Sequence, residues 1–206
     1  MTVGDIKIQA LKLMFVTYDR DITPDSLDEL GADINYRAYL INMNGSIDRC
    51  LADIEKRCIL PAKIQAITPS AEPVAGYMTR CEITASDFYD IERVSKEDLY
   101  EYDGDHPYMR EGNTILLKEY DPSAKYNLIY YPKARRASVL RDTDELEIPE
   151  NVAAAIPYFV KGELFREDNT SEANESMRQY EAAMASIDNP RTSKQGRVVS
   201  TFSQVW

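Results

Sequence analysis

Apolar residues recur every three or four positions in two stretches near the N-terminus, and this spacing predicts two helices. The first should begin at Thr2, whose hydroxyl can cap a helix with Asp5 in its first turn, and should end near Tyr18. The second should cover residues 33–58, where Asn44-Gly45 favours a kink or break. Its apolar members are Ile34, Ala38, Ile41, Ile47, Leu51, Ile54 and Cys58.

From residue 63 the pattern changes to the alternation of apolar and polar residues that half-buried strands show. It predicts strands over 63–68, 77–84, 114–119 and 126–131. Most tyrosines outside the two helices lie in this region or at its edges, and tyrosine suits a thin sheet because it buries a ring and keeps its hydroxyl in water. The region therefore reads as β-rich, with an acidic loop near residues 101–106.

Helical spacing returns in the last third of the chain. Pro149 fits the first turn of a helix over residues 149–164, which Pro157 should kink. Asn169 and Glu172 form a capping pattern for a last helix, and the short loop before it makes the pair an antiparallel hairpin. The apolar positions of the last helix are Ala173, Met177, Tyr180, Met184 and Ile187.

These patterns predict an α+β fold, with a helical bundle made from the N- and C-terminal helices, an inserted β-rich domain and an extended C-terminal tail. The expected parts are N-terminal helices (1–62), β-rich insertion (63–140), C-terminal hairpin (141–188) and extended arm (189–206). No apolar run approaches the roughly 18 residues of a membrane span, and the N-terminus lacks the blocks of a signal peptide. We therefore expect a protein made in a cytoplasm and without a membrane partner.

Acidic residues outnumber basic ones, and their distribution is uneven. The net charge of −11 argues against a protein that grips nucleic acid by its phosphates. Residues 141–187 hold eleven acidic and four basic side chains, whereas 188–206 hold one acid against three basic residues. The chain thus combines an acidic body with a mildly basic tail.

Residues of the types used in catalysis or metal binding do not form a recognisable set. His106 is the one histidine, and the loop Asp103-Gly104-Asp105-His106 lacks the regular spacing and closing glutamate of a calcium hand. An odd count of three cysteines, Cys50, Cys58 and Cys81, fits buried thiols in a reducing compartment and no disulfide framework. We expect no catalytic residue, no metal and no cofactor.

The C-terminal arm is the one positive signal for binding. A terminal tryptophan with a nearby phenylalanine would be a liability if exposed on a free protein, and tryptophan and arginine are common anchors of interfaces. The arm either is a disordered end or binds a partner, by adding a strand or by filling apolar pockets. The residues expected to bind are Arg191, Lys194, Arg197, Val198, Val199, Phe202, Val205 and Trp206.

Several stretches near the C-terminus form a recognisable combination: an Ile-Pro lead-in at 147–150, a helix at 155–164 that ends in Glu-Leu, and an acidic pair at 167–168. A further helix from Ala173 through Tyr180 to Met184 follows. Together these stretches resemble the phage adaptor family, the head–tail connector or head-completion proteins of the neck. The N-terminal stretch 2–6 and the tyrosine strand ending at 130–132 agree with it, whereas the insertion at 63–125 is longer than compact members have.

The resemblance implies a structural virion protein and not an enzyme. Such a protein would form a ring, usually a dodecamer, that docks on the portal, receives a tail-side neck protein and lets DNA pass through its lumen without specific binding. It would assemble in the host cytoplasm and end in the neck of the virion, with the C-terminal arm reaching along the portal. Two alternatives remain: a stopper or tail-completion subunit, and a carbohydrate-active enzyme built on the tyrosine sheet.

Overall fold

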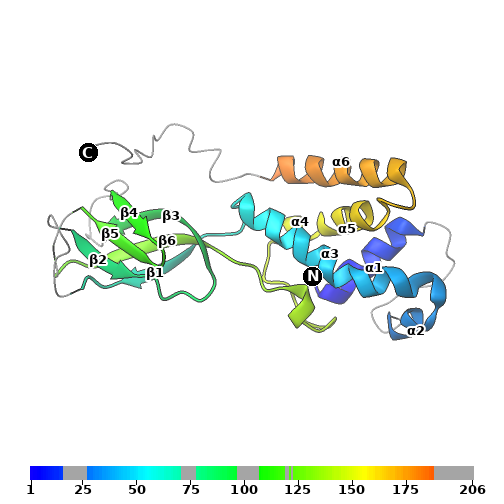
Figure 1. The fold of residues 1–206 in the computed structure, drawn as a ribbon, viewed down its shortest axis with the longest axis horizontal. Coiled ribbons are helices and arrows are strands. Elements are labelled where there is room, and N and C mark those ends of the chain that lie inside the picture. The colour runs from blue at the N-terminus through cyan, green and yellow to red at the C-terminus, as the bar shows by residue number, and fades with distance from the viewer. Residues whose placement is uncertain (16–26, 71–77, 97–106, 119–120, 122, 188–206) are drawn as a thin grey trace. The chain divides into compact units, whose positions relative to one another are not determined.

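The computed structural model describes residues 1–15, 27–70, 78–96, 107–118, 121 and 123–187 (Figure 1). These residues form two compact units, a helical unit from Met1–Leu60 together with residues 134–187, and a β unit from Pro61–Lys133. The expected mixture of helices and antiparallel strands is therefore present. Among the helices described, none is long and apolar enough to cross a membrane.

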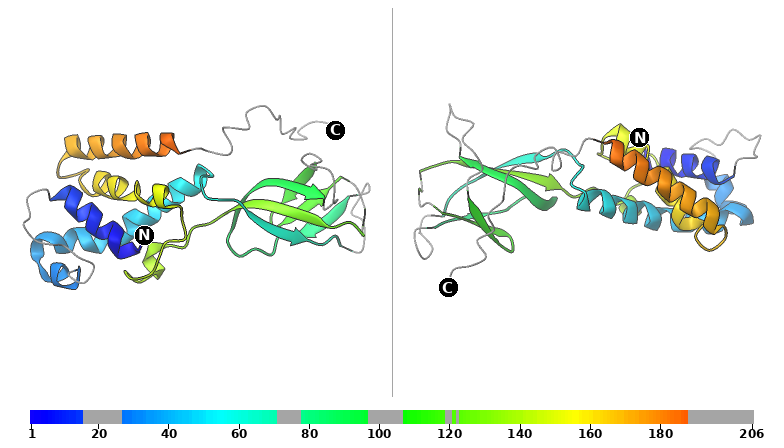
Figure 2. Two further views of the ribbon diagram at one scale, coloured as in Figure 1. Left: turned by 180° about the vertical axis from the view of Figure 1, so that it is seen from behind. Right: turned by 90° about the horizontal axis from the view of Figure 1, so that it is seen from above.

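The helical unit contains α1 and α3 from the first part of the chain and α5 and α6 from the last, with three shorter helices. Their bounds are α1 Val3–Met14, α2 Leu27–Ala32, α3 Ile34–Lys56, η2 Ala137–Val139, α4 Glu150–Ala153, α5 Ile156–Leu164 and α6 Thr170–Ser186. Helix α5 packs against α6 and also against α1 and α3, so segments from the two ends of the chain share one core (Figures 1 and 2).

Three predicted helix starts are confirmed at the level of single hydrogen bonds. Thr2 and Asp5 form a reciprocal capping box at α1, with N···O distances of 2.9 and 3.0 Å. Asp33 caps α3 by accepting the amide of Asn35, and Asn169 caps α6 by accepting the amide of Glu172. Each cap satisfies a backbone N–H that the helix itself cannot pair.

The residues around Gly4 explain how the N-terminus is held. The amide of Gly4 donates to the carbonyl of Asp142 at 2.8 Å, and the amide of Val3 donates to Asp144. A Cβ at Gly4 would lie 2.9 Å from the Asp142 carbonyl oxygen, so only glycine allows this close approach of two backbones. Lys7 adds an ion pair to Asp142 at 2.6 Å, which fixes the segment before α4 against α1.

Several helix boundaries differ from the prediction. Helix α1 ends at Met14, with Phe15 as its C-cap, and not near Tyr18. Helix α3 runs without a break through Gly45, because Met43 and Ile47 on either side are fully buried and hold both halves in line. The helix expected over 149–164 is two helices, and Pro157 stands in the first turn of α5, where its missing N–H leaves no hydrogen bond unmade. Helix α2 was not predicted.

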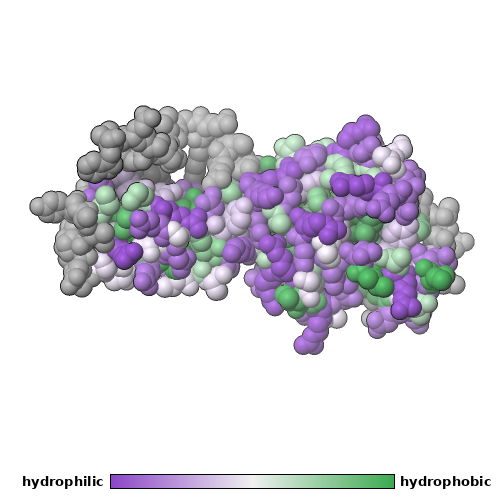
Figure 3. Space-filling view, viewed as in Figure 1, coloured by the Kyte–Doolittle hydropathy of each residue, from purple (hydrophilic) through white to green (hydrophobic). Residues whose placement is uncertain are grey.

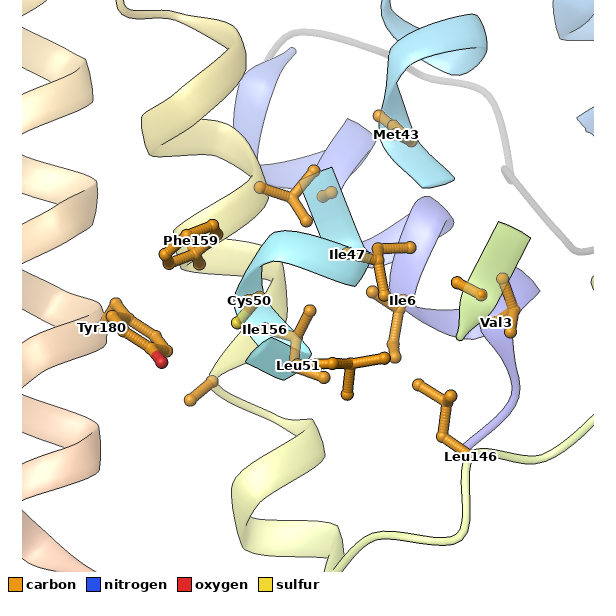
Figure 4. Packing of buried hydrophobic residues seen from close by; sticks show 14 of the residues in the cluster. Val3, Ile6, Met43, Ile47, Cys50, Leu51, Leu146, Ile156, Phe159 and Tyr180 are labelled. Carbon is orange, nitrogen blue, oxygen red and sulfur yellow. The ribbon is translucent and has the colours of Figure 1, made fainter. Parts of the chain in front are cut away.

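Aliphatic and aromatic side chains from all parts of the helical unit interlock in one core. The phenyl ring of Phe159 on α5 meets the ring of Tyr180 on α6 edge to face, with centroids 5.1 Å apart (Figure 4). Three residues earlier on α5, Ile156 points toward Leu51 of α3 and Ile6 of α1 (Figure 4). Residues in this core that are fully buried include Val3, Ile6, Leu11, Met43, Ile47, Cys50, Leu51, Ile54, Val152, Ile156, Val160 and Tyr180.

The β unit consists of two antiparallel three-stranded sheets with the orders β1-β6-β3 and β2-β5-β4. Their bounds are β1 Lys63–Ile67, β2 Thr79–Glu82, β3 Phe88–Lys96, β4 Tyr108–Glu111, β5 Thr114–Leu117 and β6 Tyr126–Pro132. The four predicted strands are thus confirmed. One cluster of buried side chains draws on both sheets: Ile67, Cys81, Ile83, Phe88, Ile91, Val94, Ile115, Leu117, Tyr126, Leu128 and Tyr130.

Strands β3 and β4 were missed, for two different physical reasons. In β3 every third residue is buried, Phe88, Ile91 and Val94, because the pairing with β6 shifts register twice along the strand. Bulges of this kind replace the two-residue period of a strand with one that resembles a helix. Strand β4 is largely exposed and therefore shows no apolar alternation at all.

Candidate functional site

Helix α6 is fastened to α3 by a network of charged and polar side chains. The Tyr180 hydroxyl donates to the Asp53 carboxylate at 2.7 Å, and Arg57 Nε donates to the same carboxylate at 2.7 Å. The other two guanidinium nitrogens of Arg57 bind both oxygens of Glu181, at 2.9 and 2.7 Å. Hydrogen bonds to Glu181, against the opposing effect of burial, raise the pKa of Arg57, so this bidentate pair stays charged.

The core side of this network is a buried thiol. Cys50 of α3 is fully buried beside Tyr180 (Figure 4), and burial raises the pKa of its thiol far above the ordinary value. Burial also raises the pKa of the Tyr180 hydroxyl, with Cys50 and Asp53 acting in the same direction. Both groups are therefore neutral hydrogen-bonding side chains at physiological pH and not nucleophiles.

A second polar anchor lies farther along α3. Glu55, only 4% exposed, accepts the amide of Ala134 at 2.7 Å and a guanidinium N–H of Arg136 at 2.8 Å. About two turns before it, Asp48 accepts the amide of Ala137 at 2.6 Å. The segment in which the chain re-enters the helical unit is thus bound to α3 by two carboxylates, and Glu55 balances its buried charge with Arg136.

In the β unit, Asp87 links two strands through its side chain. It accepts from Lys63 of β1 at 2.7 Å and from the Tyr130 hydroxyl of β6 at 2.8 Å. Burial alone would raise the pKa of Asp87, but the hydrogen bonds from Lys63 and Tyr130 outweigh it and the pKa falls below its ordinary value. Burial, together with Asp87, raises the pKa of Tyr130 to about 12.

About half of the acidic side chains between residues 141 and 187 form ion pairs. Six of the eleven do so, in the pairs Lys7–Asp142, Arg49–Glu163, Arg57–Glu181, Arg135–Glu147, Lys161–Glu172 and Arg178–Glu175. Among the described residues, Glu145, Glu150 and Glu167 are exposed and have no such pair. Two of these pairs, Arg49–Glu163 and Arg57–Glu181, join α5 and α6 to α3, while most of the acidic side chains in this range are exposed. The helical unit accordingly shows a largely hydrophilic surface (Figure 3).

Large hydrophobic side chains that are exposed mark the surfaces open to a partner. Two of them, Ile34 at 85% and Ile41 at 69% exposure, lie seven residues apart on α3. In Figure 3, hydrophobic residues interrupt the hydrophilic surface over the first half of α3. The remaining exposed ones in the described part of the chain are Ile64, Met109 and Val139, each on a different element or between elements.

The positions considered for catalysis, metal binding or partner binding fall into two groups. Asp103, Asp105, His106 and the C-terminal arm from Arg191 to Trp206 lie outside the described residues. Cys50, Cys58 and Cys81 are described, and all three are buried. Within the described ranges, no group of three or more histidine, cysteine or acidic residues is placed to hold a metal ion.

The exposed surface of α3 and the carboxylate anchors at Asp48 and Glu55 were not predicted from the sequence. Ile34 and Ile41 were counted with the other apolar members of the helix, although the six-residue step from Ile41 to Ile47 places them on a different side. No family model matches this sequence, and no curated protein matches it significantly.

Proposed function

We propose that this chain is a structural virion protein, a subunit of the head-to-tail connector ring that docks on the portal of a tailed phage and joins it to the tail. The observation that carries the proposal is where the family-like residues lie. The stretch 147–150 leads into α4, and the stretches 155–164 and 167–184 cover most of α5 and α6; α5 packs on α6 and on α1 and α3 from the other end of the chain. Most of the likeness, apart from the strand ending at 130–132, therefore falls in one structural unit.

The charge of the chain supports passage of DNA without capture. A net charge of −11 repels phosphates, and the exposed Glu145, Glu150 and Glu167 have no cation partner among the described residues. Placed around a lumen, such a surface would keep the duplex from adhering while it moves. Neither a catalytic group nor a cofactor enters the proposal.

The C-terminal arm is the proposed contact with the portal, and its aromatic and basic residues support this role. Trp206, Phe202 and Arg197 are residue types that anchor interfaces. The test is a pull-down of the matching portal with the full-length chain and with a truncation that ends at Asp188. We expect the truncated chain to lose portal binding while its helical unit still melts at the same temperature.

The second candidate is a stopper or tail-completion subunit of the neck. It is favoured by the β unit, a separate compact body that could bind a tail-side protein. The same pull-down separates the two, because a stopper would bind the tail-side neck protein and not the portal. If the full-length and truncated chains bind the portal equally well, the arm does not contribute to the portal contact.

A further inference from the structure

The first half of α3 carries an apolar stripe on its outer face. Ile34, Ala38, Ile41 and Gly45 are all exposed, and their spacing of four, three and four residues places them on one side of the helix. The opposite side of the same segment, Tyr36 and Met43, is buried in the core of the unit. The α3 stripe, as we name these four residues, is therefore an extra apolar face that the fold of the subunit does not use.

The spacing of the α3 stripe is that of a helix–helix contact. Residues that alternate at three and four positions form the seam along which two helices pack side by side. Large and small residues alternate along it, isoleucine, alanine, isoleucine and glycine in turn. Such a seam offers two knobs and two holes to a partner helix.

The stripe is complementary to a second copy of itself in the antiparallel orientation. If two α3 helices cross with their centres between residues 39 and 40, Ile34 of each copy faces Gly45 of the other. In the same register Ala38 faces Ile41, so every large side chain meets a small one. A parallel pair would place Ile34 against Ile34 and Gly45 against Gly45. The isoleucines would then be crowded, and a gap would remain between the glycines.

Charge also favours this face for contact between copies. Two chains with a net charge of −11 repel each other, so they associate best where acids are absent. From Ile34 to Gly45 the one charged residue is Arg37, at the margin of the stripe, and Arg37 has no ion pair with any residue in the described ranges. Interface centres are depleted of charge in this way, while arginine is common in them.

We propose that two copies of this protein pair through the α3 stripe, antiparallel and about a two-fold axis. The contact is isologous, so it closes on itself and differs from the head-to-tail contacts that build a ring. The proposed pairing does not depend on whether the protein is a connector subunit. Because four residues from each copy bury less than a standard interface of about 1,600 Å², the expected dissociation constant is on the order of 10 µM.

The register is tested by a cysteine pair, Ile34→Cys with Gly45→Cys, in the full-length chain. The two positions are eleven residues apart on one helix, about 16 Å along its axis, so they cannot form a disulfide within a copy. In the proposed pair, position 34 of each copy faces position 45 of the other, which gives two sites for a disulfide between copies. Mild oxidation should therefore give a covalent dimer. The controls are the variants Ile34→Cys alone and Gly45→Cys alone, in a chain whose own three cysteines are buried. Each should remain mostly monomeric on a non-reducing gel, because neither position faces itself across the pair.

The stripe itself is tested by Gly45→Leu and followed by sedimentation of the free protein over a concentration series. Within the subunit a Cβ at Gly45 meets only Arg49 Nη1, at 3.6 Å, so the leucine fits the folded chain. In the pair it fills the hole that Ile34 of the other copy needs, and self-association should weaken about tenfold or more. The matched control is Ala182→Leu, which places the same side chain at an exposed position of α6 and should change nothing.

Two results would overturn the proposal. One is a wild-type chain that remains monomeric at concentrations far above about 10 µM. The other is a dimer that Gly45→Leu leaves intact, because the contact would then lie on another surface. Should Gly45→Leu fold poorly, Ile34→Ser and Ile41→Ser change side chains that are already in solvent and must weaken the same association.

Discussion

The Tyr180 hydroxyl of α6 donates to the Asp53 carboxylate of α3 across 2.7 Å, which links residues 127 positions apart in the sequence. The same carboxylate holds Arg57, and Arg57 in turn holds Glu181 on α6. This network closes the helical unit at the point where the last helix meets the first long one. It therefore joins the N-terminal and C-terminal parts of the chain by directed bonds in addition to apolar packing.

Removal of the Tyr180 hydroxyl should measure what this link contributes. Tyr180→Phe keeps the edge-to-face contact with Phe159 and deletes one hydrogen bond to a carboxylate. We expect the free energy of unfolding to fall by about 1–2 kcal/mol, as determined by urea titration. Tyr158→Phe, at a half-buried position of α5, is the control and should stay within about 0.5 kcal/mol of the wild type.

Close packing of α5 against α6 depends on Gly162. A Cβ at this position would lie 2.7 Å from Met177 and 3.2 Å from the carbonyl oxygen of Ala173, so Gly162→Ala forces the helices apart. We expect a loss of about 1–3 kcal/mol in stability, although alanine is the better helix former.

A glycine with open space around it should show the opposite effect of alanine on stability, and it serves as the control. Gly31→Ala in α2 meets nothing within 4 Å and should stabilise the protein by about 0.5–1 kcal/mol. Adding Met177→Ala to Gly162→Ala should recover part of the lost stability. If no stability is recovered, the loss in Gly162→Ala comes from the contact with the Ala173 backbone and not from the contact with Met177.

Glu55 should be the most sensitive of the acidic residues. Its replacement by alanine removes the acceptor of the Ala134 amide and leaves Arg136 without its buried counter-charge. We expect a loss of about 3 kcal/mol, measured by urea unfolding. Glu145→Ala, at an exposed position with no ion pair among the described residues, should have an effect below about 0.5 kcal/mol.

Acid should weaken the β unit through Asp87. The folded-state pKa of Asp87 lies below its unfolded value, so its contribution to stability is present above the unfolded pKa of about 3.8 and is lost as the pH falls through the folded pKa. Thermal unfolding followed between about pH 6 and pH 3 should show a steeper loss for the wild type than for Asp87→Asn. Parallel pH curves for the two proteins would contradict the assignment.

The three cysteines should report the opening of the two units separately. All are buried, and burial raises the pKa of Cys81 to about 11 and that of Cys50 higher still. A thiol reagent at about pH 8 should therefore label none of them in the native protein and all of them in denaturant. With Cys50→Ser and Cys58→Ser together, the remaining labelling follows the β unit alone.

Much of the secondary structure could be predicted because it depends on short-range chemistry. The caps at Thr2, Asp33 and Asn169 lie within three residues of the amides that they accept, and local sequence decides such bonds. Strand β1 begins with alternating polar and apolar residues, and β6 is rich in the tyrosine and isoleucine that favour strands, so both could be recognised. Strand β3 could not be recognised, because its bulges are set by β6, more than thirty residues away.

The residue pattern alone specifies the class of elements, the acidic charge and the order of helical, β-rich and helical segments along the chain. The spacing of apolar residues does not say which side of α3 faces inward: Ile34 and Ile47 lie on different sides of this helix, and packing against the neighbouring helices buries only Ile47. Periodicity states that a helix has an apolar side, but the number of neighbouring helices sets how much of that side is covered. The pairing of Tyr180 with Asp53, and of Glu55 with Arg136, likewise required the chain ends to meet in space.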